Sequence, residues 1–222
     1  MLSRTIVAVC LSSITLSFAQ MQPVVSGAQG NGNIDWAKRT VISTGIGAPN
    51  PDLPQAAQRP AALRAAQQIS LRNALETIKG IYLNSTTTVN NFMVSNDQIN
   101  SSVSGFVQGF QQQGNPKYMS DGSVEVTMSI PLDGIGGIGD ILLGTSVGST
   151  PSITSFEKTT GSREIVFTGL IIDCKGYTVK PALSPRVLDE NDREVYGSAY
   201  VSREWAVKNG VVGYSKDVQA AA

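Results

Sequence analysis

The sequence predicts an α+β protein, in which helices pack on one sheet and a smaller β-rich module follows toward the C-terminus. Three segments carry this prediction. Residues 124–130 alternate apolar and polar side chains, which is typical of a strand with one face in the core. Residues 60–79 and 96–111 repeat their apolar side chains at intervals of three and four, which is typical of helices. The expected order is strand, helix, strand, helix, strand.

The first strand is expected within residues 34–43. Ile34, Trp36 and Ile42 share one side of an alternating pattern there, with polar residues on the other side. Residues 45–51 then combine glycine with proline, and neither residue type continues a strand ladder well. The pattern therefore predicts that this strand ends before residue 45.

The first helix is predicted over residues 60–79. Pro60 suits the first helical position, because its missing N–H would have no helical partner there, and Gly80 suits a left-handed C-cap. Two apolar stripes lie on nearly opposite sides, so we expect a helix packed on a sheet with another element against its small-residue side. The stripes are Leu71, Ala74, Leu75 and Ile78, and Ala62, Ala65, Ala66 and Ile69.

A second strand and a second helix are expected next. Residues 81–94 are rich in threonine and β-branched side chains, which favours a strand. Residues 96–111 form the best helical pattern, and Ser95 and Gln98 have the spacing of a capping box. The apolar face of this helix consists of Ile99, Val103, Phe106, Val107 and Phe110.

The C-terminal half is predicted to hold a connector and a β-rich module. Residues 134–160 are rich in glycine, serine and threonine, which favours a long loop. We expect one more strand after residue 217, so the module is interpreted as shortened. The elements expected in the module, residues 161–222, are a buried strand over 164–173, a hairpin of 186–188 with 193–196, and a short helix over 201–209.

Residues 1–19 have the pattern of a secretory signal peptide. Arg4 is followed by an apolar run over residues 5–16, and small residues at positions 17 and 19 favour cleavage after Ala19. The run is shorter than a membrane span and contains serines. Cys10 lies too early to be a lipidation site. We therefore expect an exported protein, in the periplasm, at the outer membrane or secreted, with a disordered polar leader over residues 20–33.

The composition excludes several classes of chemistry. The chain of 222 residues has 17 basic and 17 acidic side chains, so it lacks the positive charge typical of nucleic-acid binding. It contains no histidine, which excludes Ser-His and Cys-His catalysis. Once residues 1–19 are removed, Cys174 is the only cysteine, and its apolar neighbourhood predicts a buried, inert thiol.

Residues 134–139 match the glycine pattern of dinucleotide-binding loops. Such a site requires a helix directly behind the glycines, whose N–H groups hold the pyrophosphate. Gly144, Gly148 and Pro151 interrupt the segment behind these glycines, so we expect a flexible loop instead.

Two further motifs are interpreted as chance matches. Ser155 and Lys158 have the spacing of a Ser-Lys nucleophile, but they lie in the polar connector. Asp189 and Asn191 begin like a calcium loop, yet the Gly and Glu that such a loop requires are replaced by Glu194 and Tyr200. We therefore expect no catalytic, metal-binding or cofactor-binding residues.

Four segments of the chain are similar to a known family. They are residues 45–49 (GIGAP), 64–66 (RAA), 71–81 (LRNALETIKGI) and 122–126 (GSVEV). With them, residues 34–133 resemble the LPP-twenty family of bacterial envelope lipoproteins, and also the N-terminal domain of flagellar assembly protein T. Residues 168–173, 181–190 and 194–197 are similar to segments attached to such domains in other exported proteins.

The resemblance implies an α+β envelope domain without known catalytic residues, associated with the outer membrane, the surface or the flagellar apparatus. The sequence departs from the family in lacking a lipidation cysteine at the mature start. We therefore expect a non-enzymatic envelope protein that contacts an envelope or flagellar protein, without nucleic acid, cofactor or a transmembrane span in the mature chain. The sequence leaves the oligomeric state open. The alternative is a secreted hydrolase with a carboxylate pair, or a carbohydrate-binding protein that uses Trp36 or Trp205.

Overall fold

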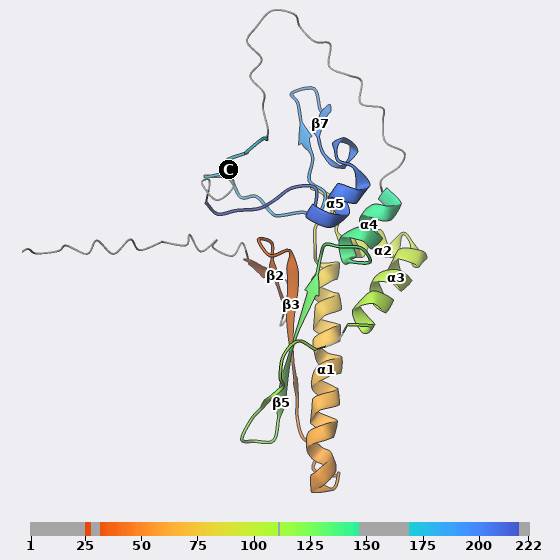
Figure 1. Cartoon of the computed structure of the whole chain (residues 1–222), viewed down its shortest axis with the longest axis vertical. Helices are drawn as coiled ribbons and strands as arrows, with labels where there is room; N and C mark the ends of the chain where they lie inside the picture. Colours follow the sequence, from red (N-terminus) through yellow and green to blue (C-terminus); the bar gives the residue numbers. More distant parts are fainter. Residues whose placement is uncertain (1–24, 28–31, 111, 147–168, 218–222) are drawn as a thin grey trace, which may run out of the picture.

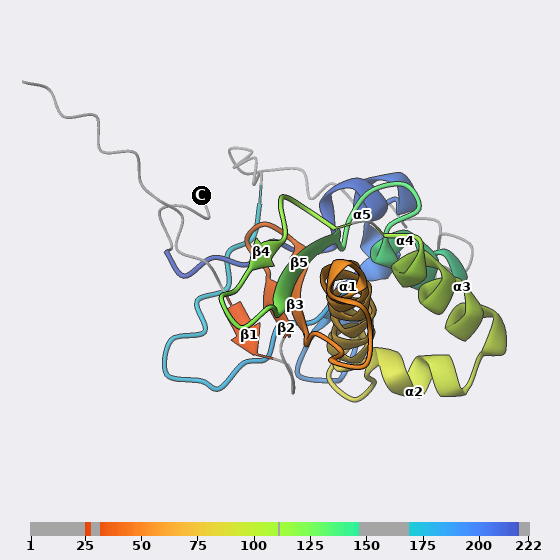
Figure 2. The same ribbon diagram turned by 90° about the horizontal axis from the view of Figure 1, so that it is seen from below.

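The computed structural model describes residues 25–27, 32–110, 112–146 and 169–217. A five-stranded antiparallel sheet has one face against the long helix α1 (Gln55–Lys79). Three shorter helices lie on the far side of α1 (Figures 1 and 2), namely α2 (Val89–Val94), α3 (Asp97–Gln108) and α4 (Ile138–Ser146). The strand order is β1-β2-β3-β5-β4. The strands are β1 (Val25–Gly27), β2 (Gly32–Asp35), β3 (Thr40–Gly47), β4 (Lys117–Tyr118) and β5 (Val124–Pro131).

The predicted α+β class is confirmed, and its clearest strand lies where the pattern indicates. In β5 every second side chain, from Val124 to Ile130, is buried against α1 and its neighbours. This strand pairs with β3 along its whole length, from Thr40 opposite Pro131 to Gly47 opposite Val124. The central pair of strands therefore follows directly from the alternation of the sequence.

The single strand predicted over residues 34–43 is two strands. Residues 36–39 form a turn, in which the Asp35 carboxylate accepts N–H bonds from Ala37 (3.1 Å) and Lys38 (3.0 Å). Arg39 has a φ of 50°, which reverses the chain into β3. The buried positions change register across the turn: Ile34 and Trp36 are buried before it, whereas Val41 and Ser43 are buried after it. Ile42 is 37% exposed, so the prediction that it shares one side with Ile34 and Trp36 was wrong.

Part of the expected disordered leader is paired backbone. Val25–Gly27 forms β1, which pairs antiparallel with β2, and residues 32–33 already belong to β2. Strand pairing satisfies backbone N–H and C=O groups whatever the side chains are, and polarity therefore does not exclude an edge strand.

Helix α1 (Gln55–Lys79) is longer than predicted, and Pro60 lies in its second turn instead of opening it. Gly80 is the C-cap, but its φ of −75° is not left-handed. The small-residue stripe, with Ala62 and Ala66, packs on the backbone of β3 and on the side chains of β5. A Cβ added at Gly45 would lie at or within 3.0 Å of backbone atoms of α1, so glycine there permits the close approach.

The strand predicted over residues 81–94 is contradicted. Val89–Val94 forms the short helix α2, and Tyr82 makes only isolated bridges, to Thr88 and Ala182. The Thr88 hydroxyl accepts the N–H of Asn91 and caps α2. Val89 and Met93 are buried one helical turn apart, so packing and a side-chain cap outweigh β-propensity here.

Helix α3 (Asp97–Gln108) confirms the second predicted helix, with Ile99, Val103 and Val107 buried. The predicted capping box is wrong. The N-cap is Asn96, whose side-chain oxygen accepts the N–H groups of Gln98 (3.1 Å) and Ile99 (3.2 Å). The pattern therefore located the helix correctly but missed its cap by one residue.

The connector predicted over residues 134–160 contains a helix. Among its described residues, Ile138–Ser146 forms α4, with Ile138, Leu142 and Leu143 buried. Burial of these side chains outweighs the cost of about 1 kcal/mol for each glycine inside a helix. The C-terminal hairpin and helix are confirmed. They are β6 (Val187–Leu188), β7 (Glu194–Tyr196), a 3₁₀ turn at Ser198–Tyr200 and α5 (Arg203–Asn209).

The buried strand predicted over residues 164–173 is contradicted where it can be compared. Residues 164–168 lie outside the described part, and residues 169–173 are exposed and belong to no strand. None of the described helices is long and apolar enough to span a membrane. Residues 1–19 also lie outside the described part.

Candidate functional site

The glycine-rich loop at residues 134–139 follows a strand and precedes a helix. Helix α4 opens directly behind the glycines, so our expectation that no helix follows was wrong. The context still differs from that of a dinucleotide site, because β5 is antiparallel to both of its neighbours. The Asp140 carboxylate accepts the Gly136 N–H (2.9 Å), which places a negative charge where a phosphate would bind.

The same loop joins the sheet to the C-terminal helix α5. The Gly134 N–H donates to the carbonyl oxygen of Val207 (2.8 Å), and Arg203 forms an ion pair with Asp140 (2.8 Å). The N–H of Gly134 and the guanidinium of Arg203 could bind a phosphate, but here they hold α5 against the loop. The loop therefore has a structural role, which the sequence pattern could not indicate because both partners lie more than 60 residues away.

A second ion pair also connects the sheet to the C-terminal part of the chain. The guanidinium of Arg39 pairs with the Asp133 carboxylate and also donates to the carbonyl oxygen of Val212 (3.2 Å). Both charged side chains are largely shielded from solvent, with 13% and 18% of their surface exposed. Gly210, with a φ of 80°, leaves room for the guanidinium. We call Arg39, Asp133, Asp140 and Arg203 the C-terminal joint.

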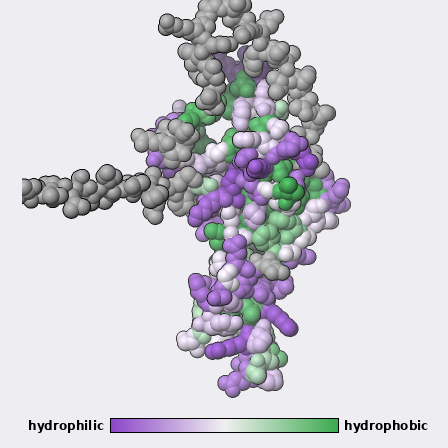
Figure 3. Space-filling model, in the orientation of Figure 1, coloured by the Kyte–Doolittle hydropathy of each residue, from purple (hydrophilic) through white to green (hydrophobic). Residues whose placement is uncertain are grey.

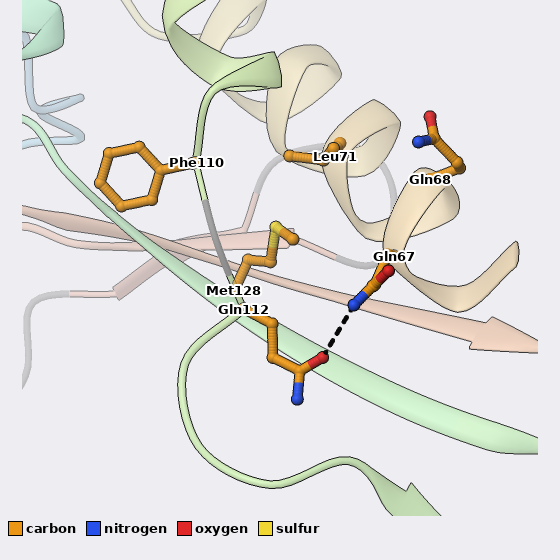
Figure 4. Close-up of a pocket in the computed structure, with 6 residues that line it drawn as sticks. All are labelled: Gln67, Gln68, Leu71, Phe110, Gln112 and Met128. Carbon is orange, nitrogen blue, oxygen red and sulfur yellow. Dashed lines mark hydrogen bonds between the residues drawn. The ribbon is translucent and has the colours of Figure 1, made fainter. Parts of the chain in front are cut away.

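A pocket of about 390 Å³ lies between α1, the residues after α3, and β5 (Figure 4). The Gln67 amide donates to the Gln112 side-chain oxygen (3.3 Å) across it. The lining side chains are Gln67, Gln68, Leu71, Phe110, Gln112 and Met128. All six are uncharged, so this pocket suits a neutral group and supplies neither an acid nor a base.

The turn at Asp189 is confirmed as a hairpin turn. Its carboxylate accepts the backbone N–H groups of Asn191 (2.8 Å) and Arg193 (2.9 Å) and pairs with the Arg193 side chain (2.7 Å). The Arg193 backbone bond, followed by its side-chain bond, lowers the pKa of Asp189 below its ordinary value. These bonds occupy the oxygens that a calcium ion would need. In the described part of the chain, no three acidic or cysteine side chains form a metal-binding group.

The two tryptophans occupy different environments. Trp36 is buried, with 2% of its surface exposed, and its ring meets that of Tyr214 edge to face. Trp205 lies on α5 and is 61% exposed. Trp205 is therefore the tryptophan with an accessible face. Ser155 and Lys158 lie outside the described residues.

Residues 169–180, which we call the apolar segment, expose large apolar side chains. Cys174 lies within it and is exposed, so the prediction of a buried thiol was wrong. The segment winds past the sheet on the side away from α1 (Figure 2). Its exposed apolar residues are Leu170 (68%), Ile171 (46%), Ile172 (55%), Tyr177 (80%) and Val179 (55%).

The sheet face opposite α1 carries further apolar groups. Ile42 and Ile46 of β3 are 37% and 48% exposed, and Thr44 lies between them. On the face shown in Figure 3, hydrophilic residues predominate over the lower half of the molecule, and hydrophobic groups are scattered among them. The apolar segment and this sheet face thus both expose large apolar side chains.

Comparison with protein families matches residues 169–222 to the second domain of Tp0624 from Treponema pallidum. The match begins at the first residue of the apolar segment and includes β6, β7 and α5. A comparison with curated proteins finds no match. The C-terminal part of the chain is thus similar to a domain that occurs in a Treponema protein.

Proposed function

We propose that this chain is an exported protein of the bacterial cell envelope that acts by binding protein surfaces and not by catalysis. The observation that carries the proposal is the apolar segment. Five large apolar side chains within ten residues are 46–80% exposed, although residues 170–172 have the composition of a buried strand. Such a concentration is unusual on the surface of a soluble monomer.

The exposed area can be compared with that of known interfaces. Full burial of an aliphatic side chain contributes about 1.5–3 kcal/mol, and each Å² of buried apolar surface contributes about 25 cal/mol. One such side chain therefore has roughly 60–120 Å² of apolar surface. The five exposed fractions then correspond to roughly 250–450 Å² of apolar surface, including the larger tyrosine. That is roughly half or more of the apolar part of one side of a standard protein–protein interface.

The envelope location rests on the sequence of residues 1–19. A positive residue, an apolar run of about a dozen residues and small residues before the expected cleavage point form the pattern of an export signal. The resemblance of residues 34–133 to the LPP-twenty family supports the same location. We propose that these residues form an LPP-twenty-like domain and that the partner belongs to the envelope or the flagellar apparatus.

Carbohydrate binding is the second candidate, and the exposure of Trp205 favours it. An exposed indole offers a flat apolar face on which a sugar ring can stack. The discriminating test is a titration with soluble cell-wall glycans, followed by tryptophan fluorescence, with Trp205→Ala as the matched variant. A saturable change that disappears in the variant would favour this candidate over protein contact.

The principal test combines fractionation with cross-linking in living cells. A photo-reactive amino acid replaces Ile172 in one variant and Val94 in the control, because Val94 is 77% exposed and lies on α2, away from the apolar segment. We expect the processed protein in the envelope or periplasmic fraction, with a protein adduct at position 172 and none at position 94. Unprocessed protein in the cytosol, or equal adducts at both positions, would refute the proposal.

A further inference from the structure

The apolar segment has the side-chain pattern of a β-hairpin. The Tyr177 N–H donates to the carbonyl oxygen of Cys174 (3.1 Å), and Gly176 has a φ of 87°, as the third residue of a type II turn requires. The described residues form no strand pairs beyond this turn, but a regular hairpin extended from it would place Ile172 opposite Val179. Leu170, Ile172, Tyr177 and Val179 would then share one face, and Ile171, Asp173 and Lys180 the other.

This apolar hairpin face lies near a second one. Figures 1 and 2 place the segment on the side of the sheet that faces away from α1, beyond the upper end of the strands. The open sheet face on that side carries Ile42 and Ile46. The apolar segment and this sheet face therefore lie on the same side of the molecule, and one partner can contact both of them.

We propose that this partner is a second copy of the chain, so that a two-fold dimer places the apolar segment of each protomer on the open sheet face of the other. The inference rests on the proposed function, since it names the partner of the same surface. A two-fold arrangement buries both surfaces on both copies and leaves neither exposed at an open end.

The areas agree with such a dimer. Adding Ile42 and Ile46 to the segment gives roughly 300–550 Å² of exposed apolar surface on each copy. A standard interface buries about 800 Å² on each partner, of which a little over half, about 450 Å², is apolar. The exposed apolar area of one copy thus matches one side of a stable interface.

The charges are also compatible with self-association. Residues 1–19 contain one basic and no acidic residue, so the mature chain has 16 basic and 17 acidic side chains, and two copies have almost no net charge to repel each other. The segment itself carries both signs, in Asp173 and Lys175, which form an ion pair at 3.5 Å. On the sheet, Lys117 and Glu125 pair at 2.6 Å. Neither surface presents a block of one charge to the other.

The test is the molar mass of the purified mature chain, residues 20–222, by light scattering after size exclusion at about 1 to 100 µM. A reducing agent is present throughout, so that a disulfide at Cys174 cannot mimic the dimer. Ile172→Ser removes an apolar group from the segment, and Ile42→Ser removes one from the sheet face. The matched control is Val94→Ser, which removes an exposed apolar side chain elsewhere.

We expect a dimer for the wild type and the control, and a dissociation constant raised about tenfold or more in each of the other variants. Circular dichroism checks that all variants are folded. A monomer at every concentration would overturn the inference, and so would a dimer that neither variant weakens. If the protein is monomeric but position 172 still cross-links to a different envelope protein in cells, the proposed function stands and only the dimer is refuted.

Discussion

Replacing Gly45 by alanine tests the close contact between β3 and α1. A Cβ at this position would lie at or within 3.0 Å of the Ala66 carbonyl oxygen and of the Ser70 amide nitrogen and Cα. These are backbone atoms of a 25-residue helix, so no side-chain rotation can relieve the overlap. The helix has to move away from the strand.

The expected cost has two contributions. Overpacking of a well-packed contact costs about 1–3 kcal/mol. The movement also stretches the buried bonds between Ser43 and Ser70, where the Ser43 hydroxyl reaches the Ser70 carbonyl oxygen at 3.0 Å and Ser70 donates to the Ser43 carbonyl oxygen at 3.2 Å. With about 1 kcal/mol for weakening them, we expect Gly45→Ala to lower the free energy of unfolding by about 3 kcal/mol.

The matched control is Gly105→Ala. Gly105 lies in α3, and a Cβ there meets nothing within 4 Å, so alanine is expected to stabilise the protein by about 0.5–1 kcal/mol. Urea unfolding followed by circular dichroism measures both variants. If Gly45→Ala costs less than about 1 kcal/mol, or the two variants change stability in the same direction, the proposed contact between α1 and β3 is wrong.

Three further predictions concern single side chains. Burial raises the pKa of Tyr214 above its ordinary value of 10.0. The contribution of the neutral Tyr214 hydroxyl to the free energy of unfolding is therefore fully present below pH 10, and it is lost as the pH rises through the pKa of the folded state. The Tyr214 hydroxyl also accepts the N–H of Ala182 (2.9 Å) and donates to its carbonyl oxygen (2.8 Å). Tyr214→Phe should therefore lower the free energy of unfolding by about 1–3 kcal/mol at pH 7. Unfolding titrations of this variant should also show a smaller fall in stability at alkaline pH. Asn96→Ala removes the cap of α3 and should cost about 1 kcal/mol, while Asn96→Asp should retain most of it, as urea midpoints will show. Arg39→Met leaves the shielded Asp133 carboxylate without its partner and should lower the free energy of unfolding by about 2–4 kcal/mol near pH 7. The double variant Arg39→Met, Asp133→Leu buries no unpaired charge, so calorimetry should find a smaller loss of stability.

The sequence predicted the elements whose burial is periodic. Helix α3 and strand β5 were found because their apolar side chains recur at helical and strand spacing and all face one core. Residues 89–94 were assigned wrongly, because β-branched composition is a weak preference that the Thr88 cap and the burial of Met93 outweigh.

Neither the C-terminal joint nor the exposure of the apolar segment could be predicted from the sequence, and the reasons differ. Arg39 and Asp133 are 94 residues apart, and nothing local marks either as a partner of the other. Residues 169–173 have the composition of a core strand, so the sequence predicts that they are buried. In the structure they are exposed. That discrepancy between composition and exposure is what points to a partner surface.

Hydrogen exchange at two protein concentrations tests most directly whether the apolar segment binds a second copy of the chain. Backbone amides of residues 169–180 have few partners in the described structure, apart from those of the turn at Cys174, so they should exchange quickly in dilute protein. Mass spectrometry at about 1 and 100 µM should show strong slowing of exchange in this segment at the higher concentration, and little change in α1. Equal exchange of the segment at both concentrations would contradict the proposed dimer.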